Sequence, residues 1–324
     1  MNSNKEIESN IFLVTGGAGF IGSAICDELI RLGAKKIRII DNLSTGNIQN
    51  IKHLLNSSKI EFINEDLCNI ETCQKACSGV DYVFHQAALG SVPRSINDPL
   101  STHKSNVDAF VNVLIASKDN EVKRFVYASS SSVYGSDISI KKKEGIAGKL
   151  LSPYALSKAT NEMYAEVFSR LYGIETIGLR YFNVFGPRQN IHGQYAAVIP
   201  RFITAFIKGE QPIIYGDGET TRDFTYVGNV VSANILAAFS DKIKCESPVL
   251  NIAFGQTTSL NSLFKTISNL LNKEMLPLYL SERPGDIKSS HADISNAKHL
   301  IGYNPMVSLD EGLNITIEWF KKSN

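Results

Sequence analysis

The stretch Ser152-Pro-Tyr-Ala-Leu-Ser-Lys158 places a phenol and an ammonium at a spacing that suits acid–base chemistry. Ser152 is a favourable helix N-cap, and Pro153 suits the first helical position, where a missing N–H costs nothing. Tyr154 and Lys158 would then lie at i and i+4 on one helix face. A nearby ammonium favours the phenolate of a group whose free pKa is about 10. The pair therefore predicts that Tyr154 acts as a base. The alternative is a packed aromatic beside an exposed lysine.

A glycine turn near the N-terminus predicts a dinucleotide site. The apolar run 11–15 ends in Gly16-Gly-Ala-Gly19-Phe-Ile-Gly22, after which apolar residues keep helical spacing. Such a turn lets the backbone approach a pyrophosphate, which faces the N-terminus of the following helix. Asp41 follows the second strand and would accept from both ribose hydroxyls while repelling a 2′-phosphate, so NAD is favoured over NADP. The alternative is a glycine turn with an incidental aspartate.

The elements that position these residues alternate between strand and helix. This alternation predicts an α/β fold with a doubly wound parallel sheet, and ligands then bind beyond the carboxyl ends of its strands. The expected strands are 11–15, 36–40, 60–63, 81–84, 124–128 and 176–181, and the expected helices are 69–77, 98–119, one from 152, 198–208, 228–240, 259–272 and 309–321. Residues 1–182, with parts of 225–255, are expected to form the nucleotide-binding domain. The discontinuous remainder of 183–324 would form a smaller C-terminal α/β substrate lobe.

Composition excludes several classes of protein. A net charge of +1 and 43% hydrophobic residues describe an ordinary globule and give no sign of nucleic-acid binding. The first ten residues are polar, and no apolar run approaches the ~20 residues that span a bilayer, so a cytoplasmic protein without membrane contact is expected. Five cysteines without a CxxC pair and six scattered histidines predict buried thiols and no metal site.

Further motifs stand in register with the glycine turn, Asp41 and the Tyr154–Lys158 pair. They are the run Ser129-Ser-Ser-Ser132-Val-Tyr-Gly135 and Arg180-Tyr-Phe-Asn183. With them the chain resembles the extended short-chain dehydrogenase/reductase family over nearly all of residues 11–321. The segments 86–96, 181–189 and 195–200 are most similar to bacterial UDP-N-acetylglucosamine 4-epimerases of surface-polysaccharide pathways.

The resemblance implies NAD-dependent 4-epimerisation of UDP-N-acetylhexosamines through a transient 4-keto sugar. Tyr154 would be the base, Lys158 would favour its phenolate, and Ser130 would hydrogen-bond the same substrate oxygen. The implied cofactor contacts are Gly16, Gly19, Phe20, Ile21, Gly22, Asp41, Asn42, Ser44, Thr45, Gly46, Asp66, Leu67, Gln86, Ala87, Ala88, Asn106, Tyr154, Lys158, Tyr181 and Val184. The implied substrate contacts are Gly90, Ser91, Ser130, Ser131, Ser132, Tyr154, Asn183, Gln189, Ala197, Val198, Tyr215, Arg222, Arg283, Asp286 and Ser290.

Several of these positions bear on the reaction and the sugar. The resemblance implies acidic residues at the positions of both Ser131 and Ser132 in related dehydratases, and a glutamate at the position of Ser132 in related decarboxylases, so neither reaction is expected. The small residues Gly90 and Ser290 would leave room for an N-acetyl group, although Ser290 could also be an ordinary loop serine. Arg222 and Arg283 would hold the pyrophosphate, where a guanidinium suits phosphate oxygens.

Four alternatives stay open. They are 4-epimerisation of UDP-glucose and UDP-galactose, 4-epimerisation of UDP-N-acetylhexosaminuronates with Arg94 or Arg188 as the cation, net oxidoreduction, and a silent NAD-binding module. The resemblance also implies a homodimer formed by helices near 98–119 and 152–172.

Overall fold

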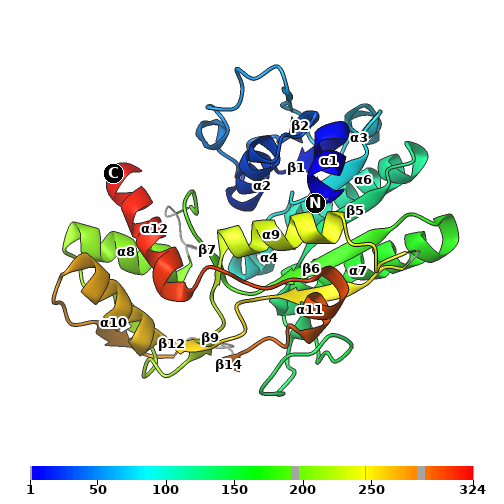
Figure 1. Ribbon diagram of the computed structural model, residues 1–324. Helices are drawn as coiled ribbons and strands as arrows, with labels where there is room; N and C mark the ends of the chain where they lie inside the picture. Colours follow the sequence, from blue (N-terminus) through cyan, green and yellow to red (C-terminus); the bar gives the residue numbers. More distant parts are fainter. Residues whose placement is uncertain (1, 191–196, 245, 283–288, 324) are drawn as a thin grey trace.

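The computed structural model describes residues 2–190, 197–244, 246–282 and 289–323 (Figure 1). A seven-stranded parallel sheet lies at its centre, in the order β11-β6-β5-β4-β1-β2-β3. Its strands are β1 (Ile11–Thr15), β2 (Lys36–Ile40), β3 (Ile60–Ile63), β4 (Tyr82–His85), β5 (Arg124–Ser130), β6 (Thr176–Tyr181) and β11 (Val249–Ile252). The predicted doubly wound α/β fold is confirmed.

Helices cover both faces of this sheet, which is why its strands are continuous apolar runs. One face packs against α2 (Phe20–Arg31), α9 (Val227–Ala238) and α11 (Ser295–Ile301). The other packs against α3 (Ile70–Cys77), α6 (Ala109–Asp119) and α7 (Pro153–Tyr172). The short N-terminal helix α1 (Asn2–Ser9) buries Ile7 in the first of these two cores.

A smaller lobe beside the sheet has a hydrophobic core of its own, which includes Phe202, Phe206 and Leu263. Figure 1 shows its three helices together on one side of the molecule. They are α8 (Val198–Lys208), α10 (Leu260–Leu271) and α12 (Leu309–Ser323). Its short strands are β7 (Val184–Phe185), β8 (Ile213–Tyr215), β9 (Thr221–Arg222), β10 (Thr225–Tyr226), β12 (Thr258–Ser259), β13 (Leu278–Leu280) and β14 (Ser289–Ser290).

The expected helix 98–119 is not continuous, which corrects the prediction. It consists of α5 (Pro99–His103), a π-helical turn η2 (Lys104–Asp108) and α6. Within the turn, the Asn106 side chain accepts from the backbone N–H of Leu89 at 2.7 Å and donates to Ser157 Oγ at 3.1 Å. Because π-helical turns often lie at functional sites, this irregularity suggests that the segment after the carboxyl end of β4 is part of one.

Other elements also differ from the expected ones. Strand β5 extends two residues further than predicted, so Ser130 is its last residue. The short helix α4 (Val92–Asn97), capped by Ser91, was not predicted, nor were the 3₁₀ turns η1 (Ile48–Asn50) and η3 (Ser131–Tyr134). Among the described residues, the structure has no helix with the length and apolarity that crossing a membrane requires.

Candidate active site

Helix α7 carries Tyr154 and Lys158 and begins as the sequence predicts. Ser152 Oγ accepts from the backbone N–H of Ala155 at 3.1 Å, and Pro153 occupies the first turn. Lys158 is 2% exposed, and its Nζ donates to the carbonyl oxygen of Ala128 at 2.8 Å. This bond fixes the helix against the carboxyl end of β5, where Ser130 lies.

Ser130 is held by the tight turn that follows β5. Its Oγ accepts from the backbone N–H of Ser132 at 3.2 Å and from Ser132 Oγ at 2.9 Å. A hydrogen bond with Ser130 also lowers the pKa of Tyr154. The structure therefore brings the predicted serine and tyrosine together.

The direction of the Tyr154 pKa shift differs from the sequence prediction. Burial raises the pKa of the phenol and outweighs the opposing hydrogen bond with Ser130. Burial also lowers the pKa of Lys158 to about 8, and the carboxylate of Glu162 opposes that shift. The Lys158 ammonium donates to the Ala128 carbonyl oxygen, and its charge does not offset the effect of burial on the pKa of the Tyr154 phenol.

The glycine turn between β1 and α2 has the geometry of a pyrophosphate site. Gly16 has φ +64°, and a Cβ at this position would lie 2.7 Å from the backbone nitrogen of Ala87. The N-cap of α2 is Gly19, which has no side chain to occupy the N–H groups of the first helical turn. The backbone can thus approach a phosphate, and the helix N-terminus faces it.

Asp41 directly follows strand β2 and is a buried carboxylate, 8% exposed. Its Oδ2 accepts from the backbone N–H of Ala18 at 3.0 Å, and its Oδ1 accepts from that of Leu43 at 2.8 Å. Burial raises the pKa of this carboxyl from its ordinary value of 3.8. Each oxygen keeps a second lone pair for a ribose hydroxyl, so the donor and acceptor set fits NAD.

A cleft of about 1200 Å³ runs along the carboxyl ends of the strands, where the strand order reverses between β1 and β4. Every predicted cofactor contact lines it except Asn106. Asn106 lies behind the cleft and supports the backbone of Leu89 instead. The lining residues from that prediction are Gly16, Gly19, Phe20, Ile21, Gly22, Asp41, Asn42, Ser44, Thr45, Gly46, Asp66, Leu67, Gln86, Ala87, Ala88, Tyr154, Lys158, Tyr181 and Val184.

The predicted substrate contacts divide into three groups. Those that line the cleft are Gly90, Ser91, Ser130, Ser131, Ser132, Tyr154, Asn183, Gln189 and Ala197. Val198, Tyr215, Arg222 and Ser290 lie in the smaller lobe and are not part of the lining, although β14 and β9 set Ser290 beside Arg222. Arg283 and Asp286 lie outside the described residues.

Helix α12 contributes two lining residues that the sequence reasoning missed, Trp319 and Phe320. Their only signal in the sequence was an apolar position in a C-terminal helix, which predicts core packing equally well. Arg188 also lines the cleft, and its Nη1 forms an ion pair with Asp27 Oδ2 at 2.7 Å. Among the described residues, no group of three or more His, Cys, Asp or Glu side chains could hold a metal ion.

Comparisons with known proteins agree with this geometry. A sequence profile described as the NAD dependent epimerase/dehydratase family matches residues 12–253. A UDP-N-acetylglucosamine 4-epimerase from Methanobrevibacter ruminantium, solved in complex with UDP-N-acetylmuramic acid, is 45% identical, with a TM-score of 0.92 over 97% of this chain and 99% of that one.

Two further solved structures are similar over nearly the whole chain. A UDP-glucose 4-epimerase from Thermotoga maritima with UDP-glucose is 37% identical, with a TM-score of 0.89 over 97% of this chain and 99% of that one. A UDP-glucuronic acid 4-epimerase from Bacillus cereus with UDP-glucuronic acid and NAD is 31% identical, with a TM-score of 0.90 over 97% and 100% of the two chains.

Proposed function

The chain belongs to the NAD-dependent epimerase/dehydratase family, and we propose that it is a UDP-sugar 4-epimerase that interconverts UDP-N-acetylglucosamine and UDP-N-acetylgalactosamine through a transient 4-keto sugar. The observation that carries this proposal is the convergence of Ser130, Tyr154 and Lys158 on the cleft that also holds the glycine turn and Asp41. Bound NAD supplies a hydride acceptor and donor there.

The three catalytic side chains handle a proton at the sugar 4-oxygen. Tyr154 Oη removes the proton of the 4-hydroxyl, and Ser130 hydrogen-bonds the same oxygen. With a pKa of about 8, Lys158 carries its proton at neutral pH and keeps a positive charge one helical turn from the phenol. When the sugar has turned its other face, Tyr154 returns the proton to the 4-oxygen.

The neighbours of Ser130 favour epimerisation over loss of water or of a carboxyl group. Both other reactions need additional proton transfer near the sugar C5 and C6, for which an acidic side chain is suited. The two residues that follow Ser130 and line the cleft are Ser131 and Ser132, and neither is a carboxylic acid.

Free space in the cleft favours an N-acetylated sugar. A Cβ built on Gly90 would meet no heavy atom within 4 Å, so the cleft is open at this point. Ser290 is a small residue set beside Arg222, which we propose holds the pyrophosphate together with Arg283. The relative with 45% identity is named for UDP-N-acetylglucosamine, whereas the UDP-glucose and UDP-glucuronic acid enzymes share 37% and 31%.

The test is to incubate the purified protein with UDP-N-acetylglucosamine, UDP-glucose or UDP-N-acetylglucosaminuronate, without added cofactor, and to separate the products by chromatography. We expect the N-acetylhexosamine to react fastest with no net formation of NADH. A tenfold or greater preference for UDP-glucose would refute the sugar assignment. Accumulation of NADH in step with product would show an oxidoreductase, and no reaction with any sugar would support a silent NAD-binding module.

The variant Ser290→Tyr tests the space for the N-acetyl group. A bulky side chain here should reduce turnover of UDP-N-acetylglucosamine selectively and leave turnover of UDP-glucose unchanged. Ser289→Tyr is the matched control, because successive residues of a strand point to opposite faces. An unchanged ratio of the two activities in Ser290→Tyr would show that this residue does not select the sugar.

We also propose that the protein is a homodimer. Helix α7 leaves Leu156, Met163, Leu171 and Tyr172 more than half exposed, in an apolar pattern that a partner helix would cover.

We propose the following division into domains. Residues 1–182 with parts of 225–255 would form the NAD-binding domain. The remainder of 183–324 would hold the UDP-sugar.

A further inference from the structure

One carboxylate joins the catalytic helix to two strands of the sheet. Glu162 lies one turn after Lys158 on α7. Its Oε1 accepts from Ser129 Oγ on β5 at 2.5 Å and from Arg180 Nε on β6 at 2.9 Å. Its Oε2 accepts from Arg180 Nη2 at 2.7 Å. With side chains 12% and 10% exposed, Glu162 and Arg180 form a buried bidentate ion pair.

These contacts lie directly behind the catalytic groups. Ser129 precedes Ser130 in the chain, and the Lys158 ammonium is bound to the carbonyl oxygen of Ala128 just before them. Glu162 therefore holds the same helix against the same strand end, one turn further along. Glu162 itself does not line the cleft and touches no reacting atom.

We propose that Glu162 is a positioning residue for the catalytic pair, which fixes α7 against β5 and β6 and balances the buried positive charge of Lys158. The inference rests on the proposed role of Tyr154 as the base. It extends that role by naming the group that keeps the neighbouring ammonium charged in a buried site, where an uncompensated charge is costly.

The groups around Lys158 leave Glu162 as its counter-charge. On β4, burial and the charge of Lys158 lower the pKa of His85 to about 3, so this imidazole is neutral. On β5, burial raises the pKa of Tyr127 well above its usual value, so this phenol is neutral too. On β6, Arg180 is a second cation, stacked 4.8 Å from the centroid of the Tyr134 ring. The Glu162 carboxylate is paired with Arg180 and lies one helical turn from Lys158 on α7, and its charge raises the pKa of Lys158.

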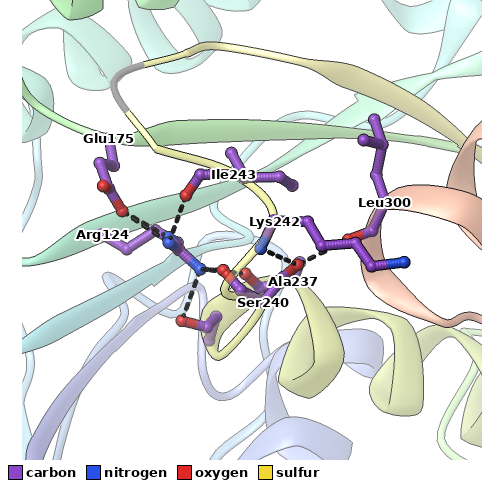
Figure 2. A network of polar contacts seen from close by, with 8 residues as sticks. Arg124, Glu175, Ala237, Ser240, Lys242, Ile243 and Leu300 are labelled. Carbon is purple, nitrogen blue, oxygen red and sulfur yellow. Dashed lines mark hydrogen bonds and ion pairs between the residues drawn. The ribbon is translucent and has the colours of Figure 1, made fainter.

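A second Arg–Glu pair, in which the arginine lies on β5, provides a matched control. At the start of β5, Arg124 Nε and Nη2 donate to Glu175 Oε2 at 2.9 and 2.6 Å, and the same guanidinium also donates to backbone carbonyl oxygens, including those of Ala237 and Ile243 (Figure 2). As in the pair of Glu162 and Arg180, the guanidinium donates to the carboxylate through Nε and Nη2, although here both bonds go to one carboxylate oxygen. This pair lies at the opposite end of β5 from Ser130, and neither of its residues lines the cleft.

The experiment is to titrate Lys158 by NMR in protein labelled with ¹³C at lysine Cε, with Lys158→Met to assign the signal. The wild-type lysine should titrate near 8. In Glu162→Gln its pKa should fall by about one unit or more, because a neighbouring opposite charge has been removed. Glu175→Gln should leave it unchanged. An unchanged Lys158 titration in Glu162→Gln, or an equal shift in Glu175→Gln, would overturn the proposal.

Turnover gives the second readout. At pH 9, above the wild-type Lys158 pKa of about 8, each unit by which this pKa falls should reduce the fraction of lysine held as ammonium, and therefore kcat, about tenfold. The KM for the UDP-sugar should stay within about twofold, because Glu162 hydrogen-bonds to Ser129 and Arg180 and neither of these is a predicted substrate contact. An equal loss in KM, with kcat retained, would contradict a positioning role.

If Glu162→Gln does not fold, the same NMR titration of Lys158 is made in Arg180→Gln. Removing the guanidinium leaves the Glu162 carboxylate beside Lys158 alone, so the Lys158 pKa should rise above the wild-type value. A fall or no change would overturn the proposal. These titrations need no turnover, so a wild-type protein without epimerase activity would refute the proposed function and leave the role of Glu162 to the NMR result.

Discussion

Replacing Asp41 with asparagine should weaken NAD binding and reduce the preference for NAD over NADP. Both carboxylate oxygens accept backbone N–H groups, from Ala18 and Leu43, while facing the cleft. The asparagine side chain has only one acceptor oxygen. Its NH₂ group would therefore face the backbone N–H of Ala18 or Leu43, and one acceptor for a ribose hydroxyl would be lost. Losing a hydrogen bond to a charged group costs about 1.5–3 kcal/mol, which raises Kd for NAD about ten- to a hundredfold.

The measurement is a titration of cofactor-stripped protein with NADH and NADPH, followed by nucleotide fluorescence at fixed ionic strength. Asp81→Asn is the matched control, because Asp81 Oδ2 also accepts a backbone N–H, from Ile11 at 2.7 Å, but lies outside the cleft lining. The NADPH affinity should rise or stay constant in Asp41→Asn, since the repulsion of a 2′-phosphate is gone. An NAD affinity within twofold of wild type, with an unchanged NADH to NADPH ratio, would refute the assignment of Asp41.

The pH dependence of this binding has a definite sign. Burial raises the pKa of Asp41 above its ordinary value of 3.8, so the carboxyl takes up its proton at a higher pH than an exposed aspartate does. A protonated carboxyl offers fewer acceptors to the ribose. NAD affinity should therefore fall as the pH drops through this raised pKa, and the fall should be absent in Asp41→Asn.

Three further predictions concern the base, the glycine turn and helix α12. Tyr154→Phe should lower kcat about 10²- to 10⁴-fold with NAD binding unchanged, measured by product chromatography, and retention of a tenth of the activity would show that another group is the base. Gly16→Ala should lower the free energy of unfolding by about 1–3 kcal/mol, because the new Cβ meets the backbone of Ala87 at a positive φ, whereas Gly90→Ala should be neutral in the same thermal melts. Trp319 is the sole tryptophan of the sequence and lines the cleft, so its fluorescence should change when NADH or a UDP-sugar binds. An unchanged spectrum would show that α12 contacts neither ligand.

Local sequence signals predicted much of the fold. Six strands of the central sheet appeared as short apolar runs, and the caps at Ser152 and Asp98 marked two helix starts that the structure confirms. The π-helical turn could not be predicted from periodicity, because it depends on the contact of Asn106 with Leu89, seventeen residues earlier. Strand β11 was likewise not singled out, since its place beside β6 is set by pairing across about 70 residues.

The candidate site was predictable where one segment carries the whole signal. The glycine turn, Asp41 and the Tyr154–Lys158 pair are of this kind. Glu162 escaped notice because its meaning lies in contacts with Ser129 and Arg180, which come from different strands. The sign of the Tyr154 pKa shift was wrong for a related reason, because burial depends on the packing of several segments and outweighs the neighbours that the sequence reveals.

Strand β11 joins the central sheet late in the chain, so the nucleotide-binding sheet cannot be produced as a contiguous N-terminal fragment. The chain leaves the sheet after β6, forms α8 and the first short strands of the smaller lobe, returns Val249–Ile252 to the edge of the sheet, and then completes the lobe with α10 and α12. A fragment truncated after residue 182 would lack this strand and α9, and would expose the edge of β6, whose six residues are all buried in the full chain. An uncovered apolar edge of this kind recruits other chains, so such a fragment should aggregate.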